Sequence, residues 1–349
     1  MTFFKLIRNV ANSFCVLKNR NREMKVCIFG AGSIGGFLAA YLSKANNEVS
    51  LIARGSNLEA YKEKGIKLYH GDRFVQASPF ATNDSQEIGT VDLVFVTVKA
   101  PGLFDVGKKI RPLLGIETKV VFAMNGIPWW YGLDSSRENR IAKDILDPSG
   151  ILHREVASQR IVGCVVDCPA FVDAPGVIIS KRNSQGVFTL GLPKFSGTCS
   201  LEAISKCMFD AGLQAPVVEN FEQAVWNKLI VNLSRSPLAV LTGVNEMELA
   251  YDDEITEITK EMILEAAQVA DAHGIKLELD WDRLLKPDYR SEHRSSMLQD
   301  WDGKRPMEID AILKVVCLFA KKAGVRSPTM NRVLSLLTMK ARAAGIYDG

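Results

Sequence analysis

A glycine pattern between a predicted strand and a predicted helix constrains the fold more than any other stretch. Residues 26–29 form a short apolar run, GAGSIG (30–35) follows directly, and 34–43 shows helical apolar spacing before a second apolar run at 48–53. In such a βαβ unit the first glycine makes a tight turn, the second lets the backbone approach a pyrophosphate, and the third lets helix and strand pack closely. The phosphates lie at the helix N-terminus. We therefore expect dinucleotide contacts from Gly30, Ala31, Gly32, Ser33, Ile34 and Gly35.

The end of the second apolar run bears on which dinucleotide binds. An Asp or Glu there would bind the ribose 2′-hydroxyl of NAD and repel a 2′-phosphate, but VSLIARG (49–55) places Arg54 at this position. An arginine accepts a 2′-phosphate through charge-assisted hydrogen bonds. The alternative is a solvent-facing arginine in a loop, which leaves the missing acid unexplained. The sequence therefore predicts NADPH as the cofactor.

Two further apolar runs end in polar residues that could contact a ligand. VDLVFVTVKA (91–100) is typical of a parallel strand buried on both faces and ends at Lys99, and KVVFAMNGI (119–127) ends with Asn125 and a glycine. Since open α/β sheets bind ligands at the carboxyl ends of their strands, both residues are candidates. For Asn125 the alternative is an ordinary Asn-Gly turn. The aromatic loop PWWY (128–131) either lines a site or covers one edge of the sheet.

The sequence pattern changes near residue 160. Short β-rich runs separated by turn residues fill 160–191 and predict an antiparallel extension of the sheet. The later chain shows helical apolar spacing at 256–273 and 306–322, with Ser327-Pro328 as the cap and first residue of the last helix. We expect an α/β Rossmann-type N-terminal domain and a mainly α-helical C-terminal domain. The predicted boundaries are 1–24 for an N-terminal extension, 25–194 for the first domain and 195–349 for the second.

Composition argues against several classes of protein. The net charge is +3 without a long basic run, so nucleic-acid binding has no support. No stretch approaches the roughly 18 consecutive apolar residues of a membrane span. The seven cysteines are scattered without a CxxC pair and the four histidines lack ligand spacing, so we expect free thiols, no metal site and a cytoplasmic location. The basic, acid-poor residues 1–24 are interpreted as a dispensable extension or, alternatively, as an organelle-targeting segment.

The stretch AVWNKLIVN (224–232) places a lysine inside an apolar run. In a helix Lys228 and Asn232 would share one face, because they are four residues apart. The alternative is a surface lysine whose stem passes a buried face. Further on, RSSMLQDWDGKRPMEID (294–310) places Ser296 before a short helical stretch and Glu308 near a helix start, where the helix dipole favours a carboxylate. Taken alone, Ser296 is a helix cap and Glu308 a first-turn acid.

Together and in this order, these motifs resemble the ketopantoate reductase family, which converts 2-dehydropantoate to pantoate with NADPH. The resemblance covers roughly residues 25–345. Its anchors are GAGSIGG (30–36), Arg54, Lys99, Asn125-Gly126, WNKLIVN (226–232), SSMLQD (295–300) and EID (308–310). The combination is much more specific than any single motif.

The resemblance implies a role for each motif. Lys228 is similar to the family's catalytic lysine, which protonates the 2-oxo oxygen, and Glu308 to an acid that helps to fix substrate, lysine and cofactor. The remaining matches are substrate contacts at Asn232 and Ser296, Asn125 between cofactor and substrate, and Lys99 beside the cofactor. Ser236, four residues beyond Asn232, is expected to contact the substrate as well. Hydride arriving at a ketone carbon leaves negative charge on oxygen, so a positioned cation that can release its proton suits this step. Pantothenate and coenzyme A synthesis follow if the substrate is 2-dehydropantoate.

Three positions depart from the family pattern and keep the substrate open. Ser236 and His293 stand where the family usually has asparagine, and Met124 where glutamine is common, so another 2-oxo acid is an alternative substrate. A β-hydroxyacid dehydrogenase also combines a Rossmann start with a lysine and an asparagine four residues apart, but the stretch 160–191 fits that class poorly. A non-catalytic NADPH sensor is the third alternative. The exposed faces of the C-terminal helices are compatible with a homodimer or with a monomer.

Overall fold

The computed structural model describes residues 23–133, 140–180, 186–196, 200–290, 292 and 294–348. The predictions for residues 1–22 of the extension and for His293 lie outside these residues. The chain forms two compact units, one of residues 1–98, 106–123 and 155–219, the other of residues 99–105, 124–154 and 220–349. Residues 99–105 and 124–154, which precede the predicted boundary at 194, belong to the second unit, and residues 195–219, which follow it, belong to the first. The domain boundaries drawn from the sequence stay a prediction.

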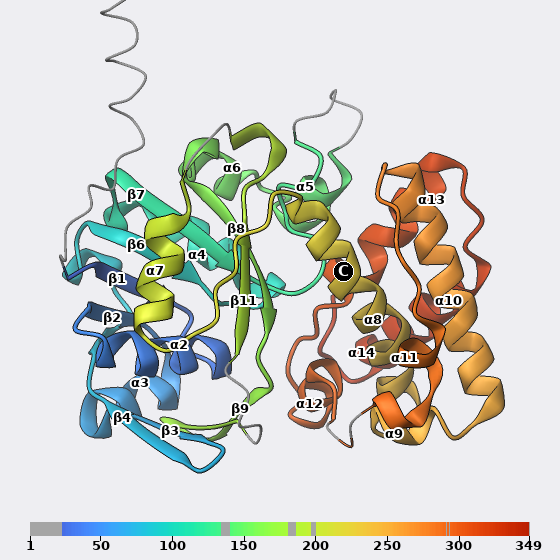
Figure 1. Ribbon diagram of the computed structural model, residues 1–349, viewed down its shortest axis with the longest axis horizontal. Coiled ribbons are helices and arrows are strands. Elements are labelled where there is room, and N and C mark those ends of the chain that lie inside the picture. The colour runs from blue at the N-terminus through green and yellow to red at the C-terminus, as the bar shows by residue number, and fades with distance from the viewer. Residues whose placement is uncertain are drawn as a thin grey trace, which may run out of the picture. The chain divides into compact units, whose positions relative to one another are not determined.

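The first unit is built on a sheet whose central strands are all parallel (Figure 1). The order across this sheet is β11 (Val187–Gly191), β8 (Ile161–Asp167), β7 (Leu114–Ala123), β6 (Val91–Val96), β1 (Lys25–Phe29), β2 (Glu48–Ile52) and β5 (Phe80–Thr82). Neighbouring strands pair in parallel except for β11, which pairs antiparallel with β8. The Rossmann-type prediction is confirmed, although β6 ends at Val96 and leaves Lys99 beyond the strand.

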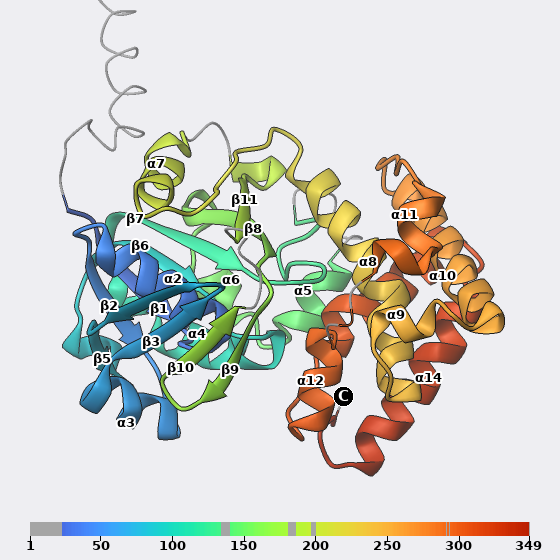
Figure 2. The same cartoon turned by 60° about the horizontal axis from the view of Figure 1, so that its bottom comes forward.

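A second, four-stranded sheet also belongs to the first unit (Figure 2). Its order is β4 (Arg73–Ala77), β3 (Ile66–His70), β10 (Val177–Ser180) and β9 (Ala170–Ala174). The prediction that 160–191 forms an antiparallel extension of the sheet is therefore correct only for β11, which pairs antiparallel with β8 at the edge of the main sheet. Only β8 and β11 join the main sheet, and β8 pairs in parallel with β7, while β10 pairs in parallel with β3. The alternating apolar pattern of these runs is the same for either sheet and cannot distinguish them.

Helix α2 (Ser33–Lys44) packs between the two sheets of the first unit, which explains its composition. It contacts β1 and β2 of the main sheet and β3, β4, β9 and β10 of the second. A helix covered on both faces needs apolar or small residues all round, and Phe37, Leu38 and Leu42 are fully buried. The unit also contains α3 (Gly55–Lys64) and α7 (Glu202–Asp210).

The second unit is mainly helical, as predicted. Its helices are α5 (Ile141–Leu146), α8 (Phe221–Thr242), α9 (Glu246–Leu249), α10 (Asp253–Ala272), α11 (Trp281–Leu285), α12 (Ser296–Asp302), α13 (Val315–Ala323) and α14 (Pro328–Ala343). The π-helical turn η8 (Asp310–Lys314) leads directly into α13. Two more helices, α4 (Leu103–Lys109) and α6 (Ile151–Glu155), contain residues of both units.

Helix α8 is the centre of the second unit, because α9, α10, α12 and α14 all pack against it (Figure 1). Trp226 of α8 is fully buried, and its indole Nε1 donates a 2.8 Å hydrogen bond to the hydroxyl of Tyr131. Trp129 and Trp130 are buried as well. The aromatic loop 128–131 thus packs against α8 and α13 of the helical unit, a role that neither interpretation from the sequence included.

Helix ends in the second unit differ from the sequence expectations in instructive ways. The last helix begins at Pro328 as predicted. Its first backbone amides, those of Thr329 and Met330, each donate a 2.8 Å hydrogen bond to the carboxylate of Glu265. The N-cap of α12 is Ser295, whose hydroxyl accepts from Leu298, so Ser296 is not the cap. The helix expected over 306–322 begins later, because the π-helical turn starts at Asp310.

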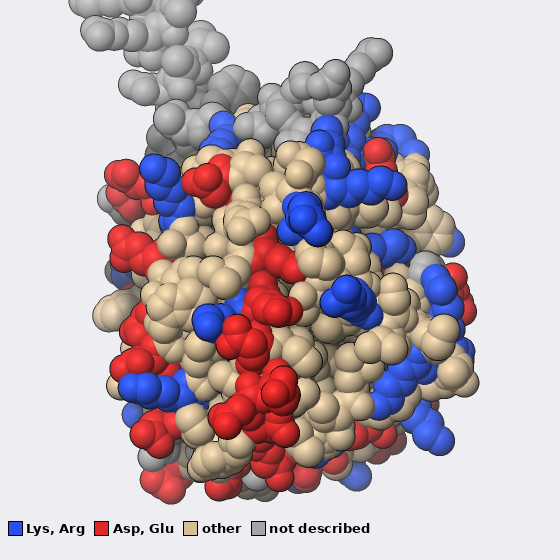
Figure 3. All heavy atoms as spheres, turned by 90° about the vertical axis from the view of Figure 1, so that its right-hand side faces the viewer, with Lys and Arg blue, Asp and Glu red and all other residues tan. Residues whose placement is uncertain are grey.

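None of the helices that the structure describes is long and apolar enough to cross a membrane. On the face of the molecule that Figure 3 shows, acidic side chains form a band. Helix α10 contributes exposed acids, which are Asp253, Glu254, Glu257 and Glu261. The described chain therefore carries acid-rich as well as basic surface.

Candidate functional site

The glycine-rich turn of the first unit is shaped by two close approaches and one opening. Gly30 has φ +107°, and a Cβ atom there would lie 2.8 Å from the amide nitrogen of Val98. A Cβ atom on Gly35 would lie 2.2 Å from the carbonyl oxygen of Gly30. Gly32, in contrast, has no heavy atom within 4 Å of its Cβ position. The protein itself requires the first and third glycines, whereas the second leaves space that a bound phosphate would use.

The helix that follows this turn is suited to bind an anion. Gly32 is the N-cap of α2 and offers no side-chain cap, and the first turn carries no acidic residue. The positive end of the helix dipole and the amide groups of that turn therefore remain available to a phosphate. Arg54 lies at the end of β2, exposed, as the N-cap of α3. These residues fit a dinucleotide.

In the second unit, three of the predicted site residues, Lys228, Asn232 and Ser236, lie on α8. Lys228 and Asn232 are both partly exposed, although their neighbours Leu229 and Leu233 are buried. Ser236, one turn further, is 3% exposed and precedes Pro237, which lies inside the helix. Positions i, i+4 and i+8 drift only slowly around a helix. Three polar side chains therefore follow one side of the helix.

A second group of predicted residues meets in a buried acidic cluster, which we define as Asp300, Glu308, Lys99 and Arg305. Lys99 donates a hydrogen bond to the Asp300 carboxylate, and Arg305 Nε lies 3.1 Å from Asp300 Oδ1. The amide of Ala100 donates to Glu308 Oε1 at 3.3 Å. Asp300 is 2% exposed and Glu308 is 6% exposed. Buried carboxylates of this kind require such donors.

Glu308 is placed to titrate near neutral pH. Burial raises its pKa from an ordinary 4.5 to about 7, and the negative charge of Asp300 acts in the same direction. The ammonium of Lys99 and the amide of Ala100 oppose this rise by stabilising the carboxylate. Glu308 can consequently hold or release a proton under ordinary conditions, which few carboxylates can do.

The Asn-Gly turn at 125–126 is fixed against the backbone just beyond Glu308. Gly126 has φ +82°, and a Cβ there would lie 2.6 Å from the carbonyl oxygen of Ala311. That same carbonyl accepts a 2.8 Å hydrogen bond from Ile127. Ala311 belongs to the π-helical turn η8, and such turns are frequent at functional sites. The glycine is needed for packing, and Asn125 is left partly exposed beside it.

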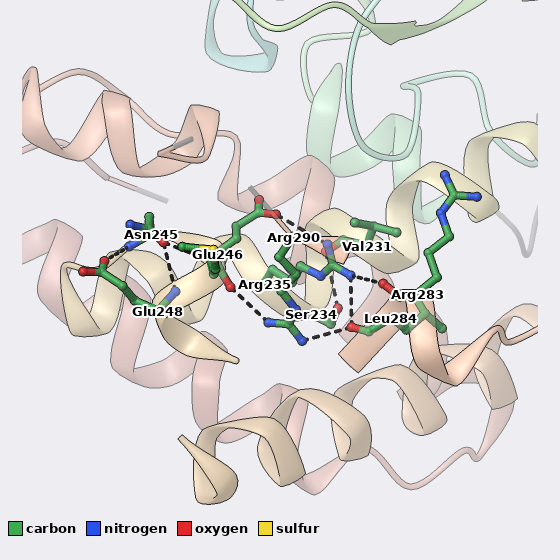
Figure 4. Close-up of polar contacts among 10 residues, drawn as sticks. Val231, Ser234, Arg235, Asn245, Glu246, Glu248, Arg283, Leu284 and Arg290 are labelled. Atoms are coloured by element: carbon green, nitrogen blue, oxygen red, sulfur yellow. Dashed lines mark hydrogen bonds and ion pairs between the residues drawn. The ribbon is translucent and has the colours of Figure 1, made fainter. Parts of the chain in front are cut away.

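A third polar group, the arginine cluster of Arg235, Arg290 and Glu246, anchors the segment that leads to α12 (Figure 4). Arg235 Nη1 lies 3.5 Å from Glu246 Oε2, and its Nη2 donates to the carbonyl of Leu284 at 3.0 Å. Arg290 donates to the same carbonyl at 3.0 Å and to that of Glu246 at 3.3 Å. Arg235 lies on α8, next to Ser236, and Arg290 lies shortly before Ser295, the N-cap of α12. The cluster therefore joins α8 to the segment before α12.

The structure brings some predicted residues together and adds others. Lys99 and Glu308 share one cluster, and α8 packs against both α12 and η8. Asp300 and Arg305 were not predicted. The available signal was spacing, since Ser296 and Asp300 are four residues apart in α12 and face the same way.

Two family models match most of the chain. Residues 26–194 match the model described as ketopantoate reductase PanE/ApbA, and residues 220–341 match its C-terminal counterpart. A 2-dehydropantoate 2-reductase from Mesorhizobium japonicum is 36% identical over 334 residues, covering 93% of this chain and all of the relative. A second one, from Pyrococcus horikoshii, is 26% identical over 325 residues, with 92% and 99% covered.

Solved structures agree with this assignment. A Ralstonia solanacearum protein assigned as a ketopantoate reductase superposes with a TM-score of 0.84 at 31% identity, covering 93% of this chain and all of that one. A complex of D-mandelate dehydrogenase with NADH and anilino(oxo)acetate has a TM-score of 0.79 at 23% identity, with 93% and 100% covered, and shows the fold alone. The chain therefore belongs to the ketopantoate reductase family and is a pyridine-nucleotide-dependent oxidoreductase that acts on CH–OH groups of a small molecule.

Proposed function

We propose that this protein reduces 2-dehydropantoate to pantoate with NADPH, and that Lys228 is the general acid. The observation that carries the proposal is a partly exposed lysine on the buried helix α8, in the motif where the family has its catalytic lysine. The relatives named 2-dehydropantoate 2-reductase support the substrate. With this substrate the reaction belongs to pantothenate and coenzyme A synthesis.

The proposed chemistry assigns one task to each part of the second unit. When held by the glycine-rich turn at 30–35, NADPH would supply hydride to C2 of the 2-oxo acid. The ammonium of Lys228 donates a hydrogen bond to the 2-oxo oxygen and then gives it a proton as negative charge develops there. Asn232, Ser236 and Ser296 hold the polar groups of the substrate. Glu308, whose pKa is raised to about 7, is suited to orient the lysine and to return a proton to it.

The choice of NADPH rests on the first unit. Arg54 is exposed at the start of α3 and is suited to accept a 2′-phosphate, whereas an acid at this position would favour NADH. The turn at 30–35 and the start of α2 would hold the pyrophosphate. We assign Lys99, Asn125 and Glu308 to the cofactor, and Asn125 and Glu308 to the substrate side as well.

One observation favours a second candidate, a reductase of the same mechanism for a different 2-oxo acid. Ser236 is buried and offers a short hydroxyl where the family usually has the longer amide of asparagine, and Met124 replaces a common glutamine. The serine shortens the reach of a hydrogen-bonding side chain, and the methionine removes one, which alters the contacts available to a hydroxylated substrate. A relative in fold acts as a D-mandelate dehydrogenase, so aryl 2-oxo acids belong in the test.

The proposal is tested by following NADPH and NADH oxidation with 2-dehydropantoate beside a panel of aliphatic and aryl 2-oxo acids. We expect NADPH and 2-dehydropantoate to give the highest kcat/KM. Lys228→Ala should lower kcat by roughly 10²–10⁴-fold, the usual range for a general acid. Asn227→Ala, an exposed neighbour on the same helix, is the matched control and should retain activity. Retained turnover in Lys228→Ala would remove the general acid, and preference for another 2-oxo acid would establish the second candidate.

A further inference from the structure

Two successive carbonyl groups of the glycine-rich turn are held by hydroxyl groups from elsewhere in the first unit. Thr97 Oγ1 donates to the carbonyl of Gly30 at 2.6 Å, and the Tyr61 hydroxyl donates to the carbonyl of Ala31 at 2.9 Å. Thr97 follows β6 directly, beside the turn. Tyr61 comes from α3, and its side chain is only 2% exposed. The bond from Tyr61 therefore reaches from another helix to the backbone beside the predicted pyrophosphate.

The surroundings of Tyr61 leave space for its hydroxyl and keep that hydroxyl protonated. A Cβ atom on Gly36 of α2 would lie 3.2 Å from the Tyr61 hydroxyl oxygen, so α2 leaves room for the hydroxyl at a glycine. Burial raises the pKa of Tyr61 to about 12, which keeps the hydroxyl protonated and able to donate. A buried carbonyl that loses its hydrogen-bond donor destabilises the protein, so the Ala31 carbonyl depends on this hydroxyl.

The position of this hydrogen bond matters because the next residue is the open glycine. A peptide group is planar, so holding the Ala31 carbonyl fixes the plane of the peptide that joins Ala31 to Gly32. Backbone hydrogen bonds also hold Gly32, from its amide to the Gly30 carbonyl and from the Gly36 amide to its own carbonyl, at 2.8 Å each, but no heavy atom lies within 4 Å of its Cβ position. The orientation of the first-turn amides of α2, which begin at Ser33, then relies on tethers such as the one from Tyr61.

We propose that Tyr61 is a positioning residue for dinucleotide binding, holding the glycine-rich turn in the conformation that receives the pyrophosphate. It also ties this turn to α3, the helix that begins after Arg54. The inference rests on the proposed binding of NADPH to the first unit. A turn that is already ordered loses less conformational entropy when the dinucleotide binds, and the affinity is correspondingly higher.

The test compares Tyr61→Phe with a matched variant, Tyr41→Phe. Tyr41 is also a buried tyrosine of the first unit, and its hydroxyl is hydrogen-bonded to His70 Nδ1 at 2.5 Å, away from the turn. Each substitution removes one buried hydroxyl and keeps the ring. The dissociation constant of NADPH is measured by its fluorescence on titration, without substrate, and the stability of both variants by urea unfolding.

We expect Tyr61→Phe to raise the dissociation constant about tenfold, the effect of one lost hydrogen bond of average strength. KM for NADPH should rise similarly, while kcat at saturating NADPH should change far less. Tyr41→Phe should lose comparable stability and keep the wild-type dissociation constant. Equal affinity of wild type and Tyr61→Phe, or equal weakening in both variants, would overturn the inference. Failure of the wild type to bind NADPH would instead overturn the proposed cofactor.

Discussion

Asp300 and Glu308 are buried carboxylates, whereas Arg235 and Arg290, in the same unit, are buried guanidinium groups, and the two pairs are neutralised differently. Asp300 is held by the side chains of Lys99 and Arg305, which are 44% and 58% exposed. The arginines are held mainly by main-chain carbonyls, with the single carboxylate of Glu246 beside them. One cluster therefore has movable partners and the other has fixed ones.

This difference separates a cluster that can respond from one that can only support. Backbone carbonyls neither titrate nor change rotamer, and although burial lowers the pKa of Arg290 to about 10, that value still leaves the group charged at neutral pH. Glu308, with a pKa of about 7, changes charge within the working range of an enzyme. We infer that the acidic cluster serves the reaction and that the arginine cluster holds α8 and the approach to α12 in place.

The largest effect is expected from Arg235→Met. It leaves the Glu246 carboxylate and the Arg283 carbonyl without their guanidinium partner and the Leu284 carbonyl with Arg290 alone, and breaking a buried pair costs about 3–5 kcal/mol. The free energy of unfolding, measured by urea titration, should fall by about that amount. Arg283→Met is the matched control, because the exposed Arg283 side chain contributes to the cluster through its backbone carbonyl. Equal losses in both variants would remove the structural role of the arginine cluster.

A smaller effect, confined to one pH range, is expected from Glu308→Gln. Because the pKa of Glu308 is raised in the folded state, the wild type loses stability as pH rises from 4.5 to about 7 and regains none above it. One pKa unit corresponds to about 1.36 kcal/mol, so the loss is at most about 3 kcal/mol, and glutamine abolishes it. Unfolding free energies across this range provide the measurement, with the exposed Glu292→Gln as control. Parallel profiles for wild type and Glu308→Gln would contradict a raised pKa.

The smallest effect is expected from Arg305→Met. The Arg305 side chain is 58% exposed, and Asp300 keeps its hydrogen bond from Lys99. Exposed ion pairs contribute about 0–1 kcal/mol, so urea unfolding should change by less than about 1 kcal/mol. A loss as large as that of Arg235→Met would show that the two clusters are supported in the same way.

Local patterns predicted the parts of the fold that local contacts determine. The unit of β1, α2 and β2 followed from the glycine spacing, and Lys228 with Asn232 followed from helical spacing. The second sheet could not be predicted, because β3 and β10 pair across about a hundred intervening residues and leave no pattern in either segment. The same applies to Glu265, which caps a helix that begins far along the chain.

The candidate site shows the same division. Its lysine and glycines lie in short motifs, whereas the partners of Glu308 come from a distant loop and helix. Asp300 lies inside a motif that was recognised, but its burial and its bond to Lys99 arise only from packing. The arginine cluster likewise draws its acceptors from carbonyl groups, which no side-chain pattern reveals.

The double cover of α2 has a consequence for the order in which the chain matures during synthesis. One side of this helix can settle on β1 and β2 early, but β9 and β10 of its other cover are not translated until about residue 180. At roughly 5–20 residues per second, that side has only β3 and β4 to cover it for several seconds or longer after the helix leaves the ribosome. An apolar helix exposed for this period is a natural place for a chaperone to bind, and a nascent chain stalled before β9 would be prone to aggregate.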